Sequence, residues 1–409
     1  MTKEKSTVPR LRFPGFTDAW KQRKLGEVLK ERNESRSPSA DVPLVSFTVE
    51  NGVTPKTERY NREFLVRDED KKYKFTQLDD IVYNPANLKF GAIARNKYGA
   101  AVFSPIYVTY GVLSEAHPLF VELIVTSTNF IQRALRYQEG TVYERMAVKS
   151  FDLLRSEIPL PTLPEQEAIG SFFSDLDQLI TLHQRKLDDV KELKKALLQK
   201  MFPKGNGNDF PELRFPEFTD AWKQRKLGEV AEKISQKNLD RQYVETFTNS
   251  AEFGIISQRD FFEKNISSLD NISGYYIVSP DDFVYNPRIS NLAPVGPIKR
   301  NKLGRVGVMS PLYTIFRFSD IHLDFVEKYF DTTIWHRYME LNGDSGARSD
   351  RFAIKDSVFK GLPIPLPALP EQEAIGNFFS DLDQLITLHQ RQLDHLKLLK
   401  KALLQQMFI

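Results

Sequence analysis

Two stretches of the chain contain basic and amide side chains but no carboxylate. Residues 81–114 and 283–319 include no aspartate or glutamate, although the whole chain has 54 acidic residues in 409. Lysine and arginine neutralise phosphates, and amide and guanidinium groups hydrogen-bond base edges, so this composition suits a groove that holds nucleic acid. Buried strands also lack acids. That alternative explains part of each stretch, but not the basic residues at matching places in both.

The candidate contact residues form two sets. In the first stretch they are Tyr83, Asn84, Lys89, Arg95 and Lys97, and in the second they are Tyr285, Asn286, Arg288, Lys299, Arg300 and Lys302. A second basic site precedes the two IPLP sequences and adds Arg145, Arg348 and Arg351. A tight turn with solvated charges explains this second site equally well.

No pattern of catalytic residues accompanies these basic ones. The chain has neither a G-x-x-x-x-G-K-[ST] phosphate loop nor a G-x-G-x-x-G dinucleotide motif. Its two VYNP sequences resemble the Asn-Pro-Pro-Tyr motif of adenine methyltransferases, but Ala86 and Arg288 follow, so the aromatic ring that would stack on a base is missing. Asp281 could open a nuclease motif, yet no suitably spaced acid-x-lysine follows it. We therefore expect no catalytic residue, no metal and no cofactor.

These stretches lie within a long internal repeat. Residues 11–28 and 213–230 are identical at 17 of 18 positions, and residues 163–202 and 369–408 are identical at 34 of 40. Between these blocks the copies share only short anchors, VYNP, RNKxG, SPxY and IPLP. The chain is therefore two copies of one module, in which near-identical ends enclose a divergent body.

The bodies differ in length as well as in sequence. The second copy carries a few extra residues between its VYNP and SPxY anchors. Insertions are tolerated in surface loops, where binding residues also tend to lie. The loop either recognises something different in each copy or has drifted without consequence, and the sequence leaves both open.

Each closing block has the pattern of a long helix that needs a partner. It begins Leu-Pro-Glu-Gln-Glu, with a proline suited to the first helical position and acids that complement the helix dipole. Thr162 and Glu165 would form a capping box in the first copy. Apolar residues then recur at heptad spacing, as at Leu176, Val190 and Leu197. A polar helix with one narrow apolar stripe requires a second helix, and the nearest is its own twin.

The predicted architecture is α+β, with two tandem α+β domains separated by two long helices that pair as an antiparallel coiled coil. Short apolar strands and helices alternate in each body. The expected boundaries are domains at 1–162 and 213–368, helices at 163–202 and 369–409, and a linker at 203–212. Proline, glycine and asparagine mark the start of that linker.

Composition limits the cellular setting. Hydrophobic residues make up 41% of the chain and charged residues 27%, as in ordinary globular proteins. No apolar run approaches the roughly 20 residues that cross a bilayer, and residues 1–10 lack the apolar core of a secretory signal. The absence of cysteine excludes disulfides and thiolate metal sites. We expect a cytoplasmic protein without a membrane partner.

The order of these parts resembles the specificity subunit of type I restriction-modification systems. The likeness covers nearly the whole chain and is carried by the LPxLPEQEAIxxFF start of each helix and by LRFPxFTDAW at residues 11 and 213. It implies that each domain is a target recognition domain that reads one half of a bipartite, asymmetric site on double-stranded DNA. It also implies that the paired helices act as a spacer and dock two methyltransferase subunits, to which restriction subunits add.

Two rival functions are compatible with parts of the sequence. A solitary DNA nuclease or methyltransferase with a diverged site would require a catalytic motif, and none is recognisable. A coiled-coil scaffold that binds only protein would not require basic residues at matching places in two acid-free stretches. Binding that weakens steeply with salt would separate a DNA reader from such a scaffold.

Overall fold

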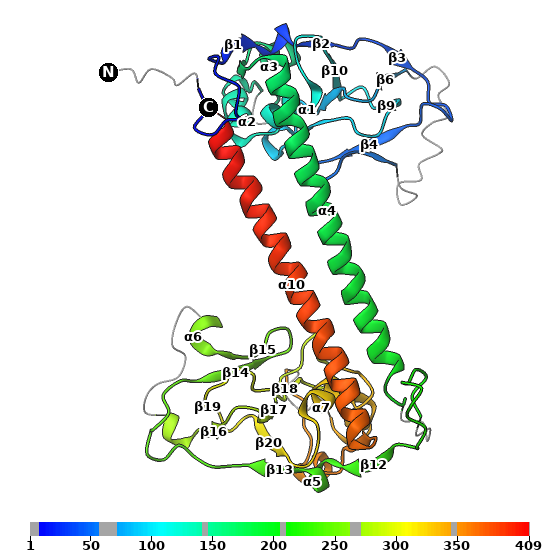
Figure 1. Cartoon of the computed structure of the whole chain (residues 1–409), viewed down its shortest axis with the longest axis vertical. Coiled ribbons are helices and arrows are strands. Elements are labelled where there is room, and N and C mark those ends of the chain that lie inside the picture. Colours follow the sequence, from blue (N-terminus) through cyan, green and yellow to red (C-terminus); the bar gives the residue numbers. More distant parts are fainter. Residues whose placement is uncertain are drawn as a thin grey trace. The chain divides into compact units, whose positions relative to one another are not determined.

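The computed structural model describes residues 8–56, 72–140, 146–204, 210–261, 271–344 and 350–408. The chain divides into two compact units, of which the first is Met1–His183 with Gln392–Ile409 and the second is Gln184–Arg391. Each unit thus contains one mixed domain and parts of both long helices (Figure 1).

The first domain is built around a four-stranded antiparallel sheet in the order β2-β10-β7-β8. Smaller ladders join β1 to β11, β4 to β5, and β3 to β6 and β9. The strands are β1 (Lys21–Lys24), β2 (Leu29–Glu31), β3 (Ser35–Arg36), β4 (Val45–Thr48), β5 (Gly52–Pro55), β6 (Tyr73–Thr76), β7 (Ile81–Tyr83), β8 (Ile93–Arg95), β9 (Ala101–Phe103), β10 (Val108–Val112) and β11 (Glu157–Leu160). The helices are η1 (Leu25–Glu27), η4 (Leu88–Phe90), α1 (Pro118–Val125), α2 (Thr128–Ala134), η5 (Leu135–Tyr137) and α3 (Ser150–Leu154).

The second domain repeats this topology, with a sheet in the order β13-β20-β17-β18 and α7 beside β18 (Figure 1). Its other ladders are β12-β21, β14-β15 and β16-β19. The strands are β12 (Lys223–Lys226), β13 (Ala231–Ile234), β14 (Phe247–Ser250), β15 (Gly254–Ser257), β16 (Tyr276–Val278), β17 (Phe283–Tyr285), β18 (Ile298–Arg300), β19 (Gly307–Met309), β20 (Thr314–Phe318) and β21 (Pro363–Leu366). The helices are α5 (Leu227–Val230), α6 (Gln258–Phe261), η6 (Ile272–Gly274), α7 (Leu323–Phe330), α8 (His336–Asn342) and α9 (Asp356–Phe359). The predicted α+β class is confirmed in both copies.

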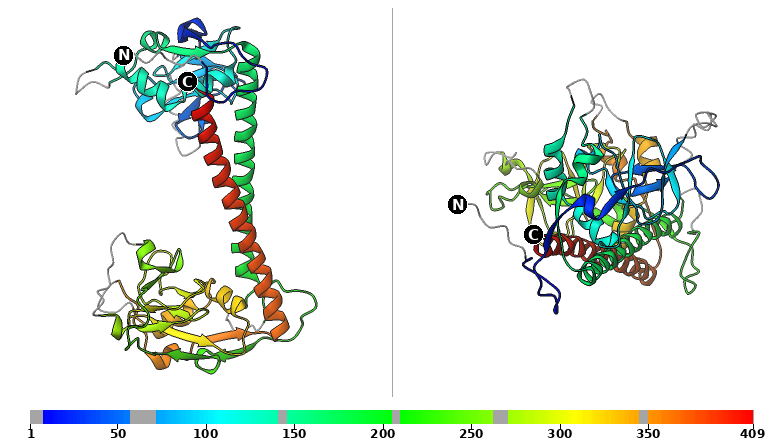
Figure 2. Two further views of the ribbon diagram at one scale, coloured as in Figure 1. Left: turned by 60° about the vertical axis from the view of Figure 1, so that its left-hand side comes forward. Right: turned by 90° about the horizontal axis from the view of Figure 1, so that it is seen from above.

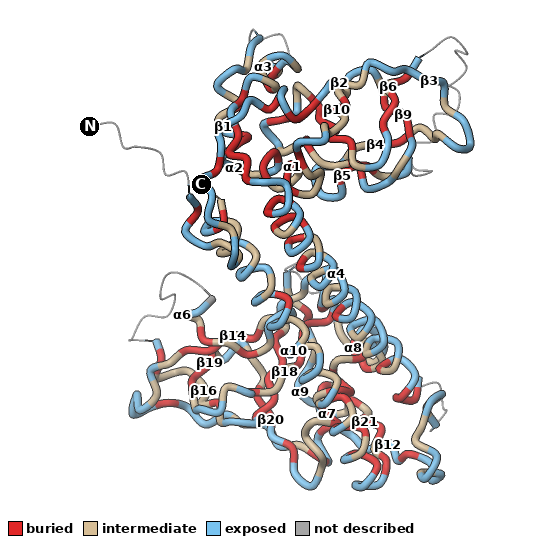
Figure 3. Tube along the Cα trace, turned by 45° about the horizontal axis from the view of Figure 1, so that its top comes forward, coloured by how far each residue is buried: buried red, intermediate tan, exposed pale blue. Residues whose placement is uncertain are grey.

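The central strands explain much of the acid-free composition. All three residues of β7 and all three of β17 are buried, and β9 and β19 are equally buried. A buried carboxylate is costly unless it is paired, so such strands exclude aspartate and glutamate. Figure 3 shows the buried residues concentrated in the strands of each domain. The alternative of buried strands therefore accounts for the strand parts of both stretches.

The two predicted helices are present as α4 (Leu163–Lys200) and α10 (Leu369–Met407). Buried residues of α4, such as Phe173, Leu176 and Leu187, are separated by three residues, four residues or combinations of these steps. They therefore lie along one side of the helix. Exposed residues predominate along the middle of α4 (Figure 3). The apolar stripe on a polar helix is confirmed.

Within each unit the two helices pair antiparallel, as predicted. In the first unit, the ring centre of Phe173 near the start of α4 lies 6.4 Å from that of Phe408, directly after α10. The carboxylate of Asp177 in α4 is 2.5 Å from the ammonium of Lys400 in α10. Figure 2 shows these two helix ends next to each other at the first domain. In the second unit the equivalent pair is Lys194 with Asp383, also at 2.5 Å. The same ion pair thus occurs in both units. In the first unit the acid is on α4 and the lysine on α10, and in the second unit the acid is on α10 and the lysine on α4.

We call the near-identical blocks of the two copies the frame; it comprises residues 11–28 with 163–202, and 213–230 with 369–408. In each copy the two blocks contact each other through a buried carboxylate. Glu165, with no exposed surface, accepts hydrogen bonds from Arg12 at 2.6 and 2.7 Å and from Trp20 Nε1 at 3.3 Å. Glu371 receives the same bonds from Arg214 and Trp222. The capping box predicted for Glu165 is therefore wrong, because Arg12 and Trp20 hold its carboxylate.

The end of each helix completes the core of the domain in the other copy. Phe408, which follows the second domain in sequence, packs 6.0 Å from Trp20 and 5.7 Å from Phe120 of the first. Phe202, which follows the first domain, packs 6.0 Å from Trp222 and 5.3 Å from Phe325 of the second. The two modules therefore exchange their last aromatic residue.

This exchange predicts the behaviour of half the chain. A chain ending at Lys204 retains Phe202 but lacks Phe408. In the whole chain Phe202 makes, in the second domain, contacts equivalent to those that Phe408 makes in the first. Two such half-chains can each complete the other's core, so we expect a symmetric homodimer. Sedimentation equilibrium at micromolar concentration measures this, and a folded monomer would contradict it. The matched control is the half-chain with Phe202→Ala, which we expect to dimerise more weakly.

Candidate nucleic-acid interface

The predicted contact residues Tyr83 and Tyr285 belong to the core. They are 0% and 3% exposed, and their hydroxyls donate to Val148 O at 3.1 Å and Val295 O at 2.9 Å. Burial raises the pKa of both phenols, so they stay neutral donors. Neither ring could touch DNA without leaving the core. Both hydroxyls instead hold neighbouring loop segments.

Asn84 and Asn286 shape the loops that follow β7 and β17. Each is nearly buried, and its side-chain oxygen accepts from the backbone NH two residues later, on Ala86 at 3.1 Å and on Arg288 at 3.0 Å. Asparagine stabilises turns in this way. The VYNP anchor therefore starts a fixed turn in each domain.

Arg95, predicted as a DNA contact, is neutralised by acids from outside the acid-free stretch. Its guanidinium lies 2.5 Å from Asp79 and 2.9 Å from Glu122, and only 12% of the side chain is exposed. Lys97 pairs with the same Glu122 at 2.8 Å but remains 60% exposed. The arginine therefore ties β8 to α1, and the lysine is the more accessible of the two.

Arg300 occupies the same position in the second domain and is held by even more carboxylates. Asp281, Asp324 and Glu327 lie 2.5, 2.7 and 3.5 Å from its guanidinium. Lys302 pairs with Glu327 at 2.9 Å and is 55% exposed. Removing Arg300 would take away the guanidinium that pairs with Asp281 and Asp324, so its substitution would test structure rather than base contact.

Among the other predicted residues, the exposed ones lie at loops. Lys89 is exposed, with its ammonium 4.9 Å from the Phe90 ring. Arg288 is 67% exposed and 3.6 Å from Asp350, and its backbone pairs with that of Arg351. Arg145 and Arg348 lie outside the described residues. The structure thus brings Arg288 and Arg351 together, as two parts of one surface.

Sequence reasoning missed a buried charge network in the second unit. Lys328 is 3% exposed and contacts Asp383 of α10 at 2.6 Å and Asp331 at 3.3 Å. Asp331 also pairs with Lys299 at 2.8 Å, and Asp383 with Lys194 of α4 at 2.5 Å. The predicted contact Lys299 is therefore part of the link between the second domain and both helices.

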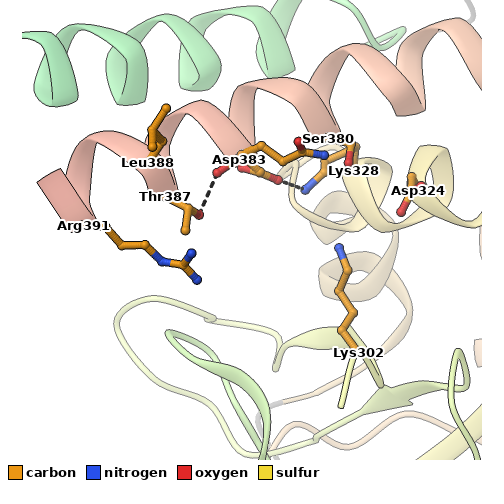
Figure 4. Close-up of a pocket in the computed structure, with 9 residues that line it drawn as sticks. Lys302, Asp324, Lys328, Ser380, Asp383, Thr387, Leu388 and Arg391 are labelled. Atoms are coloured by element: carbon orange, nitrogen blue, oxygen red, sulfur yellow. Dashed lines mark hydrogen bonds and ion pairs between the residues drawn. The ribbon is translucent and has the colours of Figure 1, made fainter. Parts of the chain in front are cut away.

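The network borders a pocket of about 440 Å³ between α7, α10 and the loop of Lys302 (Figure 4). Burial alone would lower the pKa of Lys328, but Asp331 and Asp383 outweigh it, so the pKa lies above its usual value. Burial would raise the pKa of Asp331, and Lys299 and Lys328 reverse this. Lys328 and Asp331 are therefore charged at neutral pH.

The corresponding positions of the first copy are apolar or uncharged. Where the second copy has Lys299, Lys328 and Asp331, the first has Ala94, Leu123 and Thr126. Aligning the copies on the shared Phe-Val-Glu of α1 and α7 would have identified the network. At these positions the second domain therefore contacts its helix through charged side chains, whereas the first domain has uncharged side chains there.

The described residues contain no cluster of three or more His, Cys, Asp or Glu side chains that could hold a metal ion. Within the same residues, no helix is long and apolar enough to cross a membrane.

A family model for the type I restriction modification DNA specificity domain matches the chain twice, at residues 17–192 and 219–398. The chain belongs to this family. Both matches extend from within the first frame block, through the body, and well into the long helix that follows, so the family's unit includes both frame and body.

Curated relatives support this assignment. The putative type I restriction enzyme MjaX specificity subunit of Methanocaldococcus jannaschii is 26% identical over 286 residues, covering 66% of this chain and 62% of that protein. The MjaVIII specificity subunit of the same organism is 24% identical over 277 residues, covering 65% and 64%. The matched part thus spans less than two thirds of either relative.

A solved structure has the same fold. The S subunit of a type I restriction-modification system from M. genitalium superposes with a TM-score of 0.60 at 13% identity, covering 98% of this chain and 99% of that one. The two chains therefore share one fold over nearly their whole lengths.

Proposed function

We propose that this chain is the DNA sequence-recognition subunit of a cytoplasmic type I restriction-modification complex and is not itself catalytic. Each specificity domain reads one half of a bipartite, asymmetric site on double-stranded DNA. The paired helices dock two methyltransferase subunits, and restriction subunits complete the assembly. The observation that carries this proposal is the contrast between an almost invariant frame and two divergent bodies on one topology.

That contrast separates the kinds of partner. The frame makes the same contacts in both units, including Arg12 with Glu165 and Arg214 with Glu371. Identical surfaces suit two copies of one protein subunit. The bodies share a fold but differ in their loops, which suits two half-sites of different sequence. We therefore assign docking of the methyltransferase subunits to the helices and reading of the DNA sequence to the bodies.

The DNA contacts belong on exposed residues of the bodies. Lys89, Lys97, Arg288 and Lys302 keep accessible charges and are proposed to contact DNA, and Arg351 lies beside Arg288. Arg145 and Arg348 remain proposed contacts as well. The buried or tightly paired residues at the VYNP and RNKxG anchors instead position the loops that carry these cations.

The proposal predicts activity that depends on a partner. The purified chain alone is expected neither to methylate nor to cut DNA, and to gain sequence-specific methylation when a methyltransferase subunit is supplied. Transfer of tritiated methyl groups from S-adenosylmethionine measures this. Methylation by the chain alone would contradict the proposal.

A salt titration of the chain with double-stranded DNA supplies a second test. Phosphate contacts release counterions, so the logarithm of the affinity should fall linearly with the logarithm of salt concentration, by about 0.9 per phosphate contacted. Lys89→Gln and Lys302→Gln should each reduce this slope. A slope near zero in the unaltered chain would favour a scaffold that binds only protein.

A further inference from the structure

The loops that follow β7 and β17 each present one large apolar side chain to solvent. Phe90 in the first domain is 64% exposed, and Leu292 in the second is 70% exposed. A single exposed apolar residue is ordinary on a protein surface. Here the same feature occurs twice at one topological position, in the part of each body where the two copies differ in length.

The first loop is held rigidly from both sides. Leu88 is fully buried in the core, while Phe90, two residues on, points outward. The NH of Asn84 donates to Ala92 O at 2.9 Å and closes the base of the loop. Gly91 adopts a left-handed φ of 84°, which allows the chain to reverse directly after Phe90. The outward position of Phe90 is therefore fixed by the loop.

The second loop achieves the same result with different residues. Val295 is 1% exposed and anchors the loop in the core. The backbones of Ser290 and Ala293 bond to each other at 3.0 and 3.1 Å, which leaves Leu292 at the tip of a tight turn. The side chain of Asn249 donates to Val284 O at 2.7 Å and to Pro297 O at 3.3 Å, which fixes both ends of the loop.

A cation lies in each of these loops. Lys89 places its ammonium 4.9 Å from the ring of Phe90. Arg288 stands at the start of the second loop with two thirds of its side chain exposed. An exposed apolar tip and an accessible positive charge in the same loop match a partner with phosphates around apolar surfaces. Double-stranded DNA has this chemistry, because base faces and thymine methyl groups lie between two lines of phosphates.

The difference between the copies also favours DNA over a protein partner. A methyltransferase subunit presents the same surface to both copies, so it would favour identical contacts. Phe90 and Leu292 differ in shape, and their loops differ in length and in the residues that hold them. Two half-sites of different sequence require such differences.

We propose that Phe90 and Leu292 are specificity-determining residues that contact bases, one in each half-site. This inference rests on the proposed function. An apolar side chain makes such a contact either against a thymine methyl group in the major groove or as a wedge between base steps in the minor groove. Lys89 and Arg288 hold the flanking phosphates in either case.

The test is selection of binding sites by the full chain from a DNA library with both half-sites randomised, followed by affinity measurement on the selected site. Phe90→Ala should weaken binding roughly tenfold to a hundredfold and lose sequence preference in one half-site only. Leu292→Ala should do the same in the other half-site. The matched controls are Leu78→Ala and Leu239→Ala, which remove exposed leucines, 55% and 72% accessible, elsewhere in each domain.

Two modified DNAs identify the contact. Replacing the thymines of one half-site by uracil removes their methyl groups and should weaken the unaltered chain but not the variant, if the side chain touches a methyl group. A 2-aminopurine in the half-site should brighten on binding the unaltered chain but not the variant, if the side chain acts as a wedge. Either response supports the inference.

Several outcomes would overturn it. If both variants select the original site with unchanged affinity, the tips do not contact bases, although the proposed function stands. Equal losses in the control variants, or loss of preference in both half-sites from one substitution, would assign the effect to general disruption. Unchanged DNA selection with weakened methyltransferase binding would make the tips a protein contact. If the unaltered chain selects no sequence, the proposed function itself fails.

Discussion

Replacing Glu371 with alanine should cost the second unit about 3–5 kcal/mol of unfolding free energy, because it leaves the mostly buried guanidinium of Arg214 without its carboxylate partner. Glu371 is 1% exposed and receives two bonds from Arg214 and one from Trp222. Its loss removes the hydrogen bonds that link Arg214 and Trp222 to the start of α10. Urea unfolding, followed unit by unit through hydrogen exchange, measures the effect.

The same helical turn supplies a matched control. Glu373 lies two residues further on and is exposed, so Glu373→Ala should change the unfolding free energy by less than about 0.5 kcal/mol. In the first unit, Glu165→Ala and Glu167→Ala should reproduce the contrast. Equal effects of the buried and exposed substitutions would show that the frame is not held by the carboxylate.

The second large effect is expected at Lys328. Lys328→Leu should destabilise the second unit by about 3 kcal/mol, the lower end of the range for a broken buried ion pair, because Lys299 and Lys194 continue to pair with the two acids. The triple variant Lys299→Ala, Lys328→Leu, Asp331→Thr copies the first domain and should return to within about 1 kcal/mol of the original. A triple variant as unstable as the single one would contradict this account.

The pH dependence follows from the same groups. The pKa values of Asp331 and Asp383 lie below their usual range in the folded chain. Such groups contribute stability that is fully present above their unfolded pKa of about 3.9 and is lost as the pH falls through the folded value. The raised pKa of Lys328 affects stability at high pH. Its contribution is fully present below the unfolded pKa of about 10.4 and is lost only as the pH rises above that value. The triple variant should therefore lose less stability than the original chain below about pH 4.

Local patterns in the sequence predict the architecture well. The apolar stripe through Leu176 and Leu187 is read from residues a few positions apart, and it specifies a helix that needs a partner. The near-identical repeat of the helix then identifies that partner. The two domains follow from the same repeat, because near-identical ends with shared anchors imply one topology used twice.

The site was harder to predict because its charges are paired over long distances in the sequence. Arg95 looked free when only residues 81–114 were considered, yet Glu122 lies just beyond that stretch and Asp79 just before it. Glu165 was predicted as a helix-dipole and capping-box acid, yet its partner Arg12 is 153 residues away. Counting charges in a window cannot detect such pairs, since the fold decides which acids reach which bases.

The exchanged aromatic residues have a consequence for synthesis of the chain on the ribosome. When the second domain emerges, Phe202 has already been made and can enter its core at once. The first domain must wait for Phe408, which packs against Trp20 and Phe120 and is translated only after the whole second domain. We therefore expect the domain made first to be the one completed last, leaving an open aromatic surface that chaperones can bind throughout translation.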